Sequence, residues 1–243
     1  MKTKIRIFLI SMFLLMSVPG LQAKVYLVSV GIADYPGTQN DLRLPVKDAK
    51  TIAWLYSKNT SVDYVLLLDW KATLKNVLAA MDKVFAKAGT NDIVLFFFSG
   101  HGYPGGFVVY DGQLTYETVR NAMAKSSCRN KMIFADACFS GKMRTGRRAS
   151  ENSEAEARKA NVMLFLSSRS NETSIERRDM SNGFFTTYLQ KGLRGGADTN
   201  KDRMITAREL FQYVHNGVVQ LSNGKQHPVM WGRFPNNMPV MVW

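Results

Sequence analysis

The chain has 243 residues, of which 46% are hydrophobic and 21% are charged, enough for one domain with a substantial core. Two cysteines in this length exclude a disulfide-dense scaffold and a cysteine-rich zinc module. The 32 Lys and Arg residues outnumber the 19 Asp and Glu residues, which gives a formal charge of +13. Such a charge is compatible with nucleic acid or another anionic surface as a partner, or with no specific partner.

The first 23 residues have the order of a secretory signal peptide. Met1 to Arg6 carries three positive charges, Ile7 to Met16 is almost continuously apolar, and Ser17 to Ala23 supplies a helix breaker and a small residue at the cut. The apolar run is shorter than the about 20 residues that span a bilayer, although an uncleaved anchor is the alternative. Cleavage leaves 29 of the 32 basic residues against 19 acidic ones, a charge of +10. We therefore expect a secreted or periplasmic protein with no stable membrane span after signal removal.

In the remaining chain, short apolar runs alternate with stretches of helical periodicity. The apolar runs predict strands at 24–33, 62–68, 91–98, 131–137 and 162–167. Helical spacing predicts helices at 44–56, 69–87 (with Thr73 as a cap), 115–125, 184–193 and 206–219. The run 107–110, followed by Asp-Gly, indicates half of a small hairpin. This alternation predicts an α/β fold, with a mostly parallel sheet covered by helices on both faces.

Two of the predicted strands run into reactive side chains. One leads into Ser99-Gly-His101-Gly102, and the other ends in Asp136-Ala-Cys138-Phe-Ser-Gly141. If these strands are neighbours, the thiol and the imidazole face each other at one sheet edge, which is the minimum set for nucleophilic cysteine catalysis. The imidazole would then protonate the leaving amine, and the N–H groups of Gly102 and Cys138 would stabilise the oxyanion. The alternatives are a satisfied polar histidine and a small buried cysteine.

The second cysteine, Cys128, is expected to be an inert free thiol. The predicted strand of about seven residues between Cys128 and Cys138 would hold them ~20 Å apart. A disulfide needs Cα atoms within ~7 Å of each other. Cys138 is therefore also expected to be a free thiol.

Taken together, these motifs resemble those of a caspase-fold cysteine peptidase of the metacaspase or bacterial orthocaspase type (clan CD, C14-like). The matching segments are Val25 to Gly31, Leu44-Pro-Val-Lys-Asp48-Ala49, the His101 and Cys138 motifs and, more weakly, Asn182-Gly-Phe-Phe-Thr-Thr187 and Gln226-His-Pro228. The resemblance implies His101 as the base and Cys138 as the nucleophile. Phe139 stands where many relatives have histidine. The Gln-Ala-Cys signature of true caspases is absent, which argues against specificity for aspartate.

The resemblance also implies the organisation of the chain. We expect a three-layer caspase-like fold with a roughly six-stranded sheet, in one peptidase domain at 24–243 behind a signal peptide at 1–23. The large catalytic part would cover about 24–142, a processing loop about 142–160 and a small part about 161–243. A clostripain-like or gingipain-like peptidase is a related alternative.

Two carboxylates are candidates for the substrate pocket. Asp136 lies two residues before Cys138 and so points to the same side of the sheet. A carboxylate there would raise the pKa of the Cys138 thiol and so would not help to form the thiolate. Binding a cation of the substrate is therefore the more fitting role for Asp136. The resemblance places Asp48 and Ser99 in the same pocket, and two carboxylates favour Arg or Lys before the scissile bond. The alternatives are a solvated residue in a first helical turn for Asp48 and a strand-end cap for Asp136.

The polar segment at 142–160 is expected to form an exposed loop in its first half, with a short helix at 153–160. Exposed polar loops are preferred sites of proteolytic nicking. Its basic residues would suit an enzyme of this specificity, so we expect self-cleavage there, the alternative being a solvated basic loop. The candidate positions are Lys142, Arg144, Arg147 and Arg148.

A calcium-loop pattern occurs near the C-terminus. Oxygen-bearing side chains occupy positions 1, 3, 5 and 12 of the template, at Asp198, Asn200, Asp202 and Glu209. Position 6 is Arg203, where the template needs glycine for an unusual backbone, and only one such loop exists. A polar turn that begins a helix is therefore the default, and we expect no required cofactor, with Ca²⁺ as the alternative.

The function that these expectations favour is an exported cysteine endopeptidase that cleaves after Arg or Lys, with peptides or proteins as its partners. Export and the lack of a basic helix with interleaved aromatic residues argue against nucleic acid as a partner. Two alternatives come from other classes: a catalytically idle caspase-fold binding module, and a cationic surface-binding protein.

Overall fold

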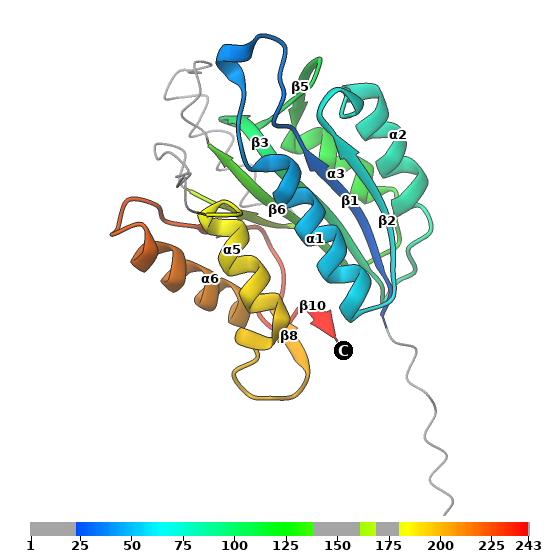
Figure 1. Ribbon diagram of the computed structural model, residues 1–243. Helices are drawn as coiled ribbons and strands as arrows, with labels where there is room; N and C mark the ends of the chain where they lie inside the picture. Colours follow the sequence, from blue (N-terminus) through cyan, green and yellow to red (C-terminus); the bar gives the residue numbers. More distant parts are fainter. Residues whose placement is uncertain (1–22, 139–160, 169–179, 243) are drawn as a thin grey trace, which may run out of the picture.

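The computed structural model describes residues 23–138, 161–168 and 180–242 (Figure 1). The N-terminal strands and helices are, in chain order, β1 (Val25–Gly31), α1 (Pro45–Asn59), β2 (Val62–Leu68), α2 (Leu74–Phe85), β3 (Ile93–Tyr103), β4 (Gly106–Val109), β5 (Gly112–Thr115), α3 (Tyr116–Ala124) and β6 (Asn130–Cys138). They are followed by β7 (Met163–Leu166), α5 (Phe184–Lys191), β8 (Met204–Thr206), α6 (Ala207–Leu221), β9 (Val229–Trp231) and β10 (Pro239–Val242).

The central sheet has the strand order β2-β1-β3-β6-β7-β9. Neighbouring strands are parallel from β2 to β7, and β9 pairs with β7 in the antiparallel direction. The hairpin β4–β5 extends from the end of β3, and β8 and β10 form a separate two-stranded sheet. The expected α/β fold with a mostly parallel sheet, six strands along its main path, is confirmed.

Helices cover both faces of this sheet, which gives three layers (Figure 1). Buried residues of α1, α5 and α6 pack on one face, and buried residues of α2 and α3 pack on the other. Successive residues of β3 alternate between these two cores: Phe96 and Phe98 join the α2–α3 side, whereas Leu95 and Phe97 join the opposite side. An apolar run without alternation is what a strand covered on both faces requires.

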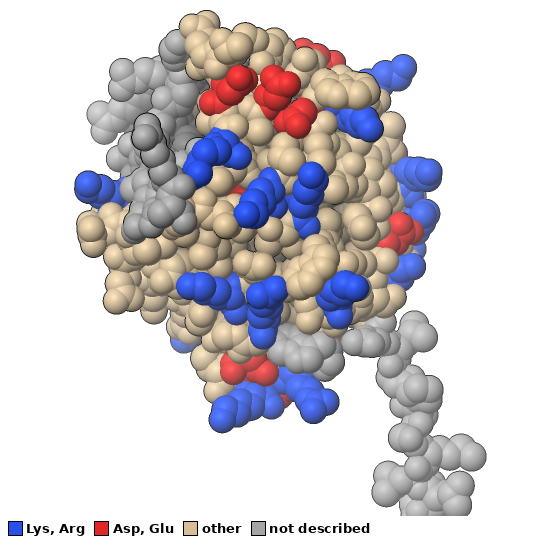
Figure 2. Space-filling view, viewed as in Figure 1, with Lys and Arg blue, Asp and Glu red and all other residues tan. Residues whose placement is uncertain are grey.

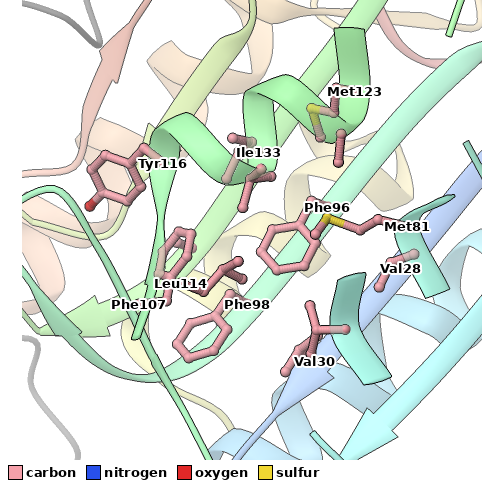
Figure 3. Packing of buried hydrophobic residues seen from close by; sticks show 14 of the residues in the cluster. Val28, Val30, Met81, Phe96, Phe98, Phe107, Leu114, Tyr116, Met123 and Ile133 are labelled. Atoms are coloured by element: carbon pink, nitrogen blue, oxygen red, sulfur yellow. The ribbon is translucent and has the colours of Figure 1, made fainter. Parts of the chain in front are cut away.

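Aromatic packing anchors the β4–β5 hairpin close to the end of β3. The rings of Phe98 and Phe107 stack with centroids 4.6 Å apart, and Phe107 meets Tyr116 edge-on at 5.0 Å. Figure 3 shows these side chains in one cluster with Leu114 and Phe96. The cluster therefore holds the hairpin against β3, next to the part of β3 that carries His101.

The sequence-based boundaries differ from the structure at a few informative places. The strand predicted to end at 98 continues as β3 to Tyr103, so His101 lies within a strand and not just beyond one. The helix predicted from 69 begins at Leu74, after a short 3-10 turn at Asp69–Lys71, with Thr73 as its cap, as expected. The strands β8, β9 and β10 were not predicted, because three or four residues are too few to show a periodicity.

Two further observations concern membrane-spanning helices and surface charge. No helix in the described ranges is long and apolar enough to cross a membrane. Lys and Arg side chains are spread over the described part of the face in Figure 2 instead of gathering at one place.

Candidate active site

The register between β3 and β6 brings the two reactive motifs side by side. In this parallel pair, Ser99 faces Asp136 and His101 faces Cys138. The two strands are therefore neighbours, as the catalytic hypothesis required. The side chain of Cys138 and residues 139–160 lie outside the described part of the structure, so the pairing rests on the backbone register. It places the histidine and the cysteine at the same level of one sheet edge.

The imidazole of His101 is held in a defined orientation by the β1–α1 connection. Its Nε2 lies 2.7 Å from the carbonyl oxygen of Asn40 and, because a carbonyl only accepts, Nε2–H is the donor. The imidazole ring also packs against Tyr35, with centroids 4.7 Å apart. This arrangement leaves Nδ1 as the basic nitrogen of a neutral His101.

Tyr35 links the backbone of His101 to the neighbouring hairpin. Its hydroxyl accepts a hydrogen bond from the His101 backbone N–H at 2.9 Å and donates one to the Val108 carbonyl at 3.0 Å. Burial raises the pKa of the Tyr35 phenol, so the hydroxyl keeps its proton and stays a donor. Gly100 has a φ of 154°, and a Cβ there would lie 2.5 Å from the Tyr35 hydroxyl, so only glycine fits.

Asp48, Ser99 and Asp136 lie together where the first turn of α1 meets the C-terminal halves of β3 and β6. We call this buried cluster, at the place of the predicted substrate pocket, the acidic pocket. Asp48 is only 1% exposed, which rules out the solvated first-turn residue of the alternative reading. Its Oδ2 accepts a hydrogen bond from Ser99 Oγ at 2.9 Å. Burial and, second, the negative charge of Asp136 raise the pKa of the Asp48 carboxyl well above its ordinary value.

The segment that begins α5 donates hydrogen bonds to both carboxylates of this cluster. Asn182 Nδ2 donates to Asp48 Oδ1 at 2.7 Å, and the Gly183 backbone N–H donates to the same oxygen at 3.2 Å. Thr186 donates twice to Asp136 Oδ2, from its backbone N–H at 3.0 Å and from its hydroxyl at 2.8 Å. Backbone N–H groups in the first turn of a helix lack intrahelical partners, which makes this helix end a favourable place for a carboxylate.

Position 183 must be glycine for a steric reason. A Cβ on Gly183 would collide with the carboxylate of Asp136, and the contact involves the whole carboxyl group. The close approach lets the backbone N–H of Gly183 reach Asp48 while Thr186 reaches Asp136. The start of α5 therefore contacts both carboxylates at once.

The sequence identified the acids of this site but missed most of the residues that hold them. The structure brings Asp48, Ser99 and Asp136 together, as the resemblance implied. Asn182 and Thr186 were noted only as parts of a weaker motif match, with no role. Asn40 and Tyr35 were missed because they act from a connecting segment, where the only signal was a turn-prone Tyr-Pro-Gly sequence.

The remaining predicted catalytic and processing residues stay predictions. Gly102 follows His101 in β3 and pairs with Phe107 of β4, and nothing here tests its role as an oxyanion donor. The processing candidates lie outside the described residues, as does the predicted helix at 153–160; these candidates are Lys142, Arg144, Arg147 and Arg148. Cys128 is a buried free cysteine whose Sγ contacts the Asp92 carbonyl oxygen at 2.8 Å, and burial raises its thiol pKa.

The calcium-loop pattern forms a polar turn before α6. The Asp198 carboxylate accepts backbone N–H groups of Asp202 and Arg203, and Arg203 adopts the positive φ of 66° that the template needs at this position. Glu209 forms a capping box with Thr206 and also accepts from Thr199. Among the described residues, no three or more His, Cys, Asp or Glu side chains gather into a group that could hold a metal. Calcium binding at Asp198, Asn200, Asp202 and Glu209 stays a prediction.

Comparisons with known proteins agree on the fold. The chain is similar to a protein from Geobacter sulfurreducens, with 18% identity, a TM-score of 0.64 and coverage of 90% of this chain and 97% of that one. It is also similar to caspase-1 from Spodoptera frugiperda, with 13% identity, a TM-score of 0.61 and coverage of 87% of both chains. A search of curated protein sequences finds no significant match.

A family comparison covers almost the whole described chain. The model of the caspase domain of the C14 peptidases matches residues 25–237, a range that includes β1, the acidic pocket, the β3–β6 pair and α6. The described fold, with its parallel sheet between two helical layers, agrees with this match. The chain belongs to the caspase-domain family of C14 peptidases.

Proposed function

We propose that this protein is an exported cysteine endopeptidase that hydrolyses peptide bonds after Arg or Lys. The observation that carries the proposal is the β3–β6 register, which pairs His101 with Cys138 and, two residues earlier, Ser99 with Asp136. Membership of a cysteine peptidase family supports the chemistry. The acidic pocket supports the basic specificity, and the signal-like N-terminus supports export.

The proposed reaction uses His101 twice. Nδ1 of His101 takes the thiol proton, and the Cys138 sulfur attacks the carbonyl carbon of the scissile bond. The carbon–nitrogen bond then breaks as the imidazolium gives its proton to the leaving amine, which leaves a thioester on Cys138. A water molecule, deprotonated by the same imidazole, attacks the thioester and releases the acid product and the thiol. The hydrogen bond from Nε2 to the Asn40 carbonyl keeps the ring oriented through both steps.

The proposed specificity follows from the charge of the acidic pocket. A guanidinium or ammonium group next to Asp48 and Asp136 would offset the repulsion between two buried carboxylates. An acidic side chain in the same place would add a third negative charge. A basic residue before the scissile bond is therefore favoured, and Arg is able to pair with two oxygens at once.

A cleavage profile tests this specificity directly. Blocked fluorogenic peptides that differ only in the residue before the reporter, with Arg, Lys, Leu or Asp there, are incubated with the purified protein. We expect kcat/KM for Arg and Lys to exceed that for Leu by about a hundredfold or more, since a buried charge pair is worth several kcal/mol. Preferred cleavage after Asp or Leu would contradict the proposal.

We also propose self-cleavage in the basic segment that follows the Cys138 motif. The candidate bonds come after Lys142, Arg144, Arg147 and Arg148, which fit the proposed specificity. Intact-mass spectrometry of the unaltered protein should then find two fragments that meet in this segment, whereas Cys138→Ala should remain one chain. Identical intact chains in both samples would exclude self-processing and would leave the peptidase proposal standing.

A further inference from the structure

Asn182 holds the most deeply buried carboxylate of the acidic pocket. Its side-chain amide donates to Asp48 Oδ1 at 2.7 Å and lies 3.2 Å from the hydroxyl oxygen of Thr51. The donor and the acceptor of the Asn182–Asp48 hydrogen bond are both shielded from water, since Asn182 is 7% exposed and Asp48 is 1% exposed. Hydrogen bonds to an ionised acceptor are short and strong, and they are stronger still where water does not compete.

The donors that reach Asp48 within the described residues are all neutral groups. They are Ser99 Oγ from β3, Asn182 Nδ2 and the Gly183 backbone N–H from the segment before α5. The charged group that faces Asp48 is Asp136 of β6, and its negative charge opposes ionisation. Burial opposes ionisation as well, so the neutral donors are what stabilises the carboxylate against both effects.

We propose that Asn182 is a positioning residue of the acidic pocket: its amide keeps Asp48 ionised and oriented, ready for a guanidinium or ammonium group of the substrate. This inference rests on the proposed function and adds a residue that decides how well the pocket binds its cation. Among the side-chain donors to Asp48, Asn182 makes the shortest bond, 2.7 Å against 2.9 Å for Ser99.

The proposal has a consequence for pH that a merely structural role does not share. A carboxyl group attracts a cation only when it is deprotonated, and the Asp48 pKa lies above its ordinary value. Affinity for a basic residue should therefore fall as the pH drops through that pKa. Removal of the Asn182 donor raises the Asp48 pKa further, so the loss of affinity should begin at a higher pH.

The test combines binding and turnover in Asn182→Ala. Calorimetry with N-acetyl-argininamide in the Cys138→Ala background measures affinity without turnover. Steady-state kinetics with an Arg peptide in the otherwise unaltered protein gives KM and kcat separately. We expect affinity to fall and KM to rise by about tenfold or more near neutral pH, as for a lost hydrogen bond to a charged group. We expect kcat to change by less than about threefold, and the acidic limb of the pH profile to move upward.

Thr51→Val is the matched control. It removes the other partner of the Asn182 amide and leaves the three donors to Asp48 in place, so affinity and pH profile should stay within about twofold of the parent. Asn182→Ser, whose shorter side chain does not span the same distance, replaces Asn182→Ala if the latter fails to fold.

The outcomes separate this inference from the proposed function. If the parent binds argininamide and the Asn182 variant binds equally well with the same pH profile, the positioning role is overturned and the specificity stands. A fall in kcat with unchanged KM would also overturn it. If the parent protein does not bind argininamide at all, the basic specificity itself fails, and this inference fails with it.

Discussion

Cys138→Ala is expected to reduce hydrolysis of an Arg peptide to background, because the proposed mechanism then lacks its nucleophile. The loss should be about a thousandfold or more, as for removal of a nucleophile in other covalent catalysts. His101→Ala should lose about a hundredfold to ten-thousandfold, the range of general acid–base catalysis. Initial rates with a fluorogenic Arg peptide measure both, and the double variant should be no slower than Cys138→Ala.

The chain contains its own control for this experiment. Cys128 lies before β6, at the end of the strand opposite to Cys138, and its buried Sγ contacts the Asp92 carbonyl. Cys128→Ala should therefore keep full activity and show at most a small loss of stability. Activity that survives in Cys138→Ala but disappears in Cys128→Ala would exclude the assigned nucleophile. Activity that survives in both would exclude cysteine catalysis.

Asp136→Asn and Asp48→Asn are expected to remove the preference for a basic residue while leaving the protein folded. The loss of one buried carboxylate that pairs with a substrate cation should lower kcat/KM for an Arg peptide by about a hundredfold. The loss should lie mainly in KM, because the pocket binds a side chain that does not react. The kcat/KM for a Leu peptide should change little, so the ratio of the two substrates is the quantity to measure.

Stability provides a second readout for Asp48→Asn, and its sign follows from the pKa. Because the folded-state pKa of Asp48 is raised, the folded protein binds a proton there that the unfolded chain has released, but only in the pH range between the two pKa values. This carboxyl therefore favours folding at low pH, and that contribution is lost as the pH rises through the folded-state pKa. The thermal midpoint of Asp48→Asn at neutral pH should equal or exceed that of the parent. A marked decrease in the thermal midpoint would mean that the Asp48 carboxylate serves mainly to accept hydrogen bonds that stabilise the fold, and not to bind the substrate.

The parts of this molecule that were predictable from sequence are those with strong local signals. Long apolar runs predicted the strands β1, β2, β3 and β6. The motifs at the ends of β3 and β6 singled out His101 and Cys138 as the candidate catalytic pair. The sequence alone could not show that β3 lies next to β6, because the alternation of strands and helices does not determine the order of strands in the sheet. The register that pairs His101 with Cys138 came only with the structure.

The supporting residues were hard to predict for a different physical reason. Asn182 acts on Asp48 from 134 positions away, and Thr186 acts on Asp136 from 50 positions away. A hydrogen bond over such a separation leaves no periodicity, and the Asn-Gly pair at 182–183 looks locally like any ordinary start of a helix. Tyr35 and Asn40 are similar, since their contacts with His101 depend on the path of a connection that has no regular repeat.

The parallel pairing of β3 with β6 ties the proposed recognition of the substrate cation to the proposed hydrolysis. Asp136 precedes Cys138 by two residues on one strand, and Ser99 precedes His101 by two on the other, so both functions share one ladder with a spacing of about 6.6 Å. A slip of either strand by a single residue would turn its two side chains to the opposite face and disable both proposed functions together. The distance between the proposed cation-binding carboxylate and the proposed nucleophile is thus set by the backbone. A change in the preferred side-chain length would require a bulge or an insertion between those two rungs.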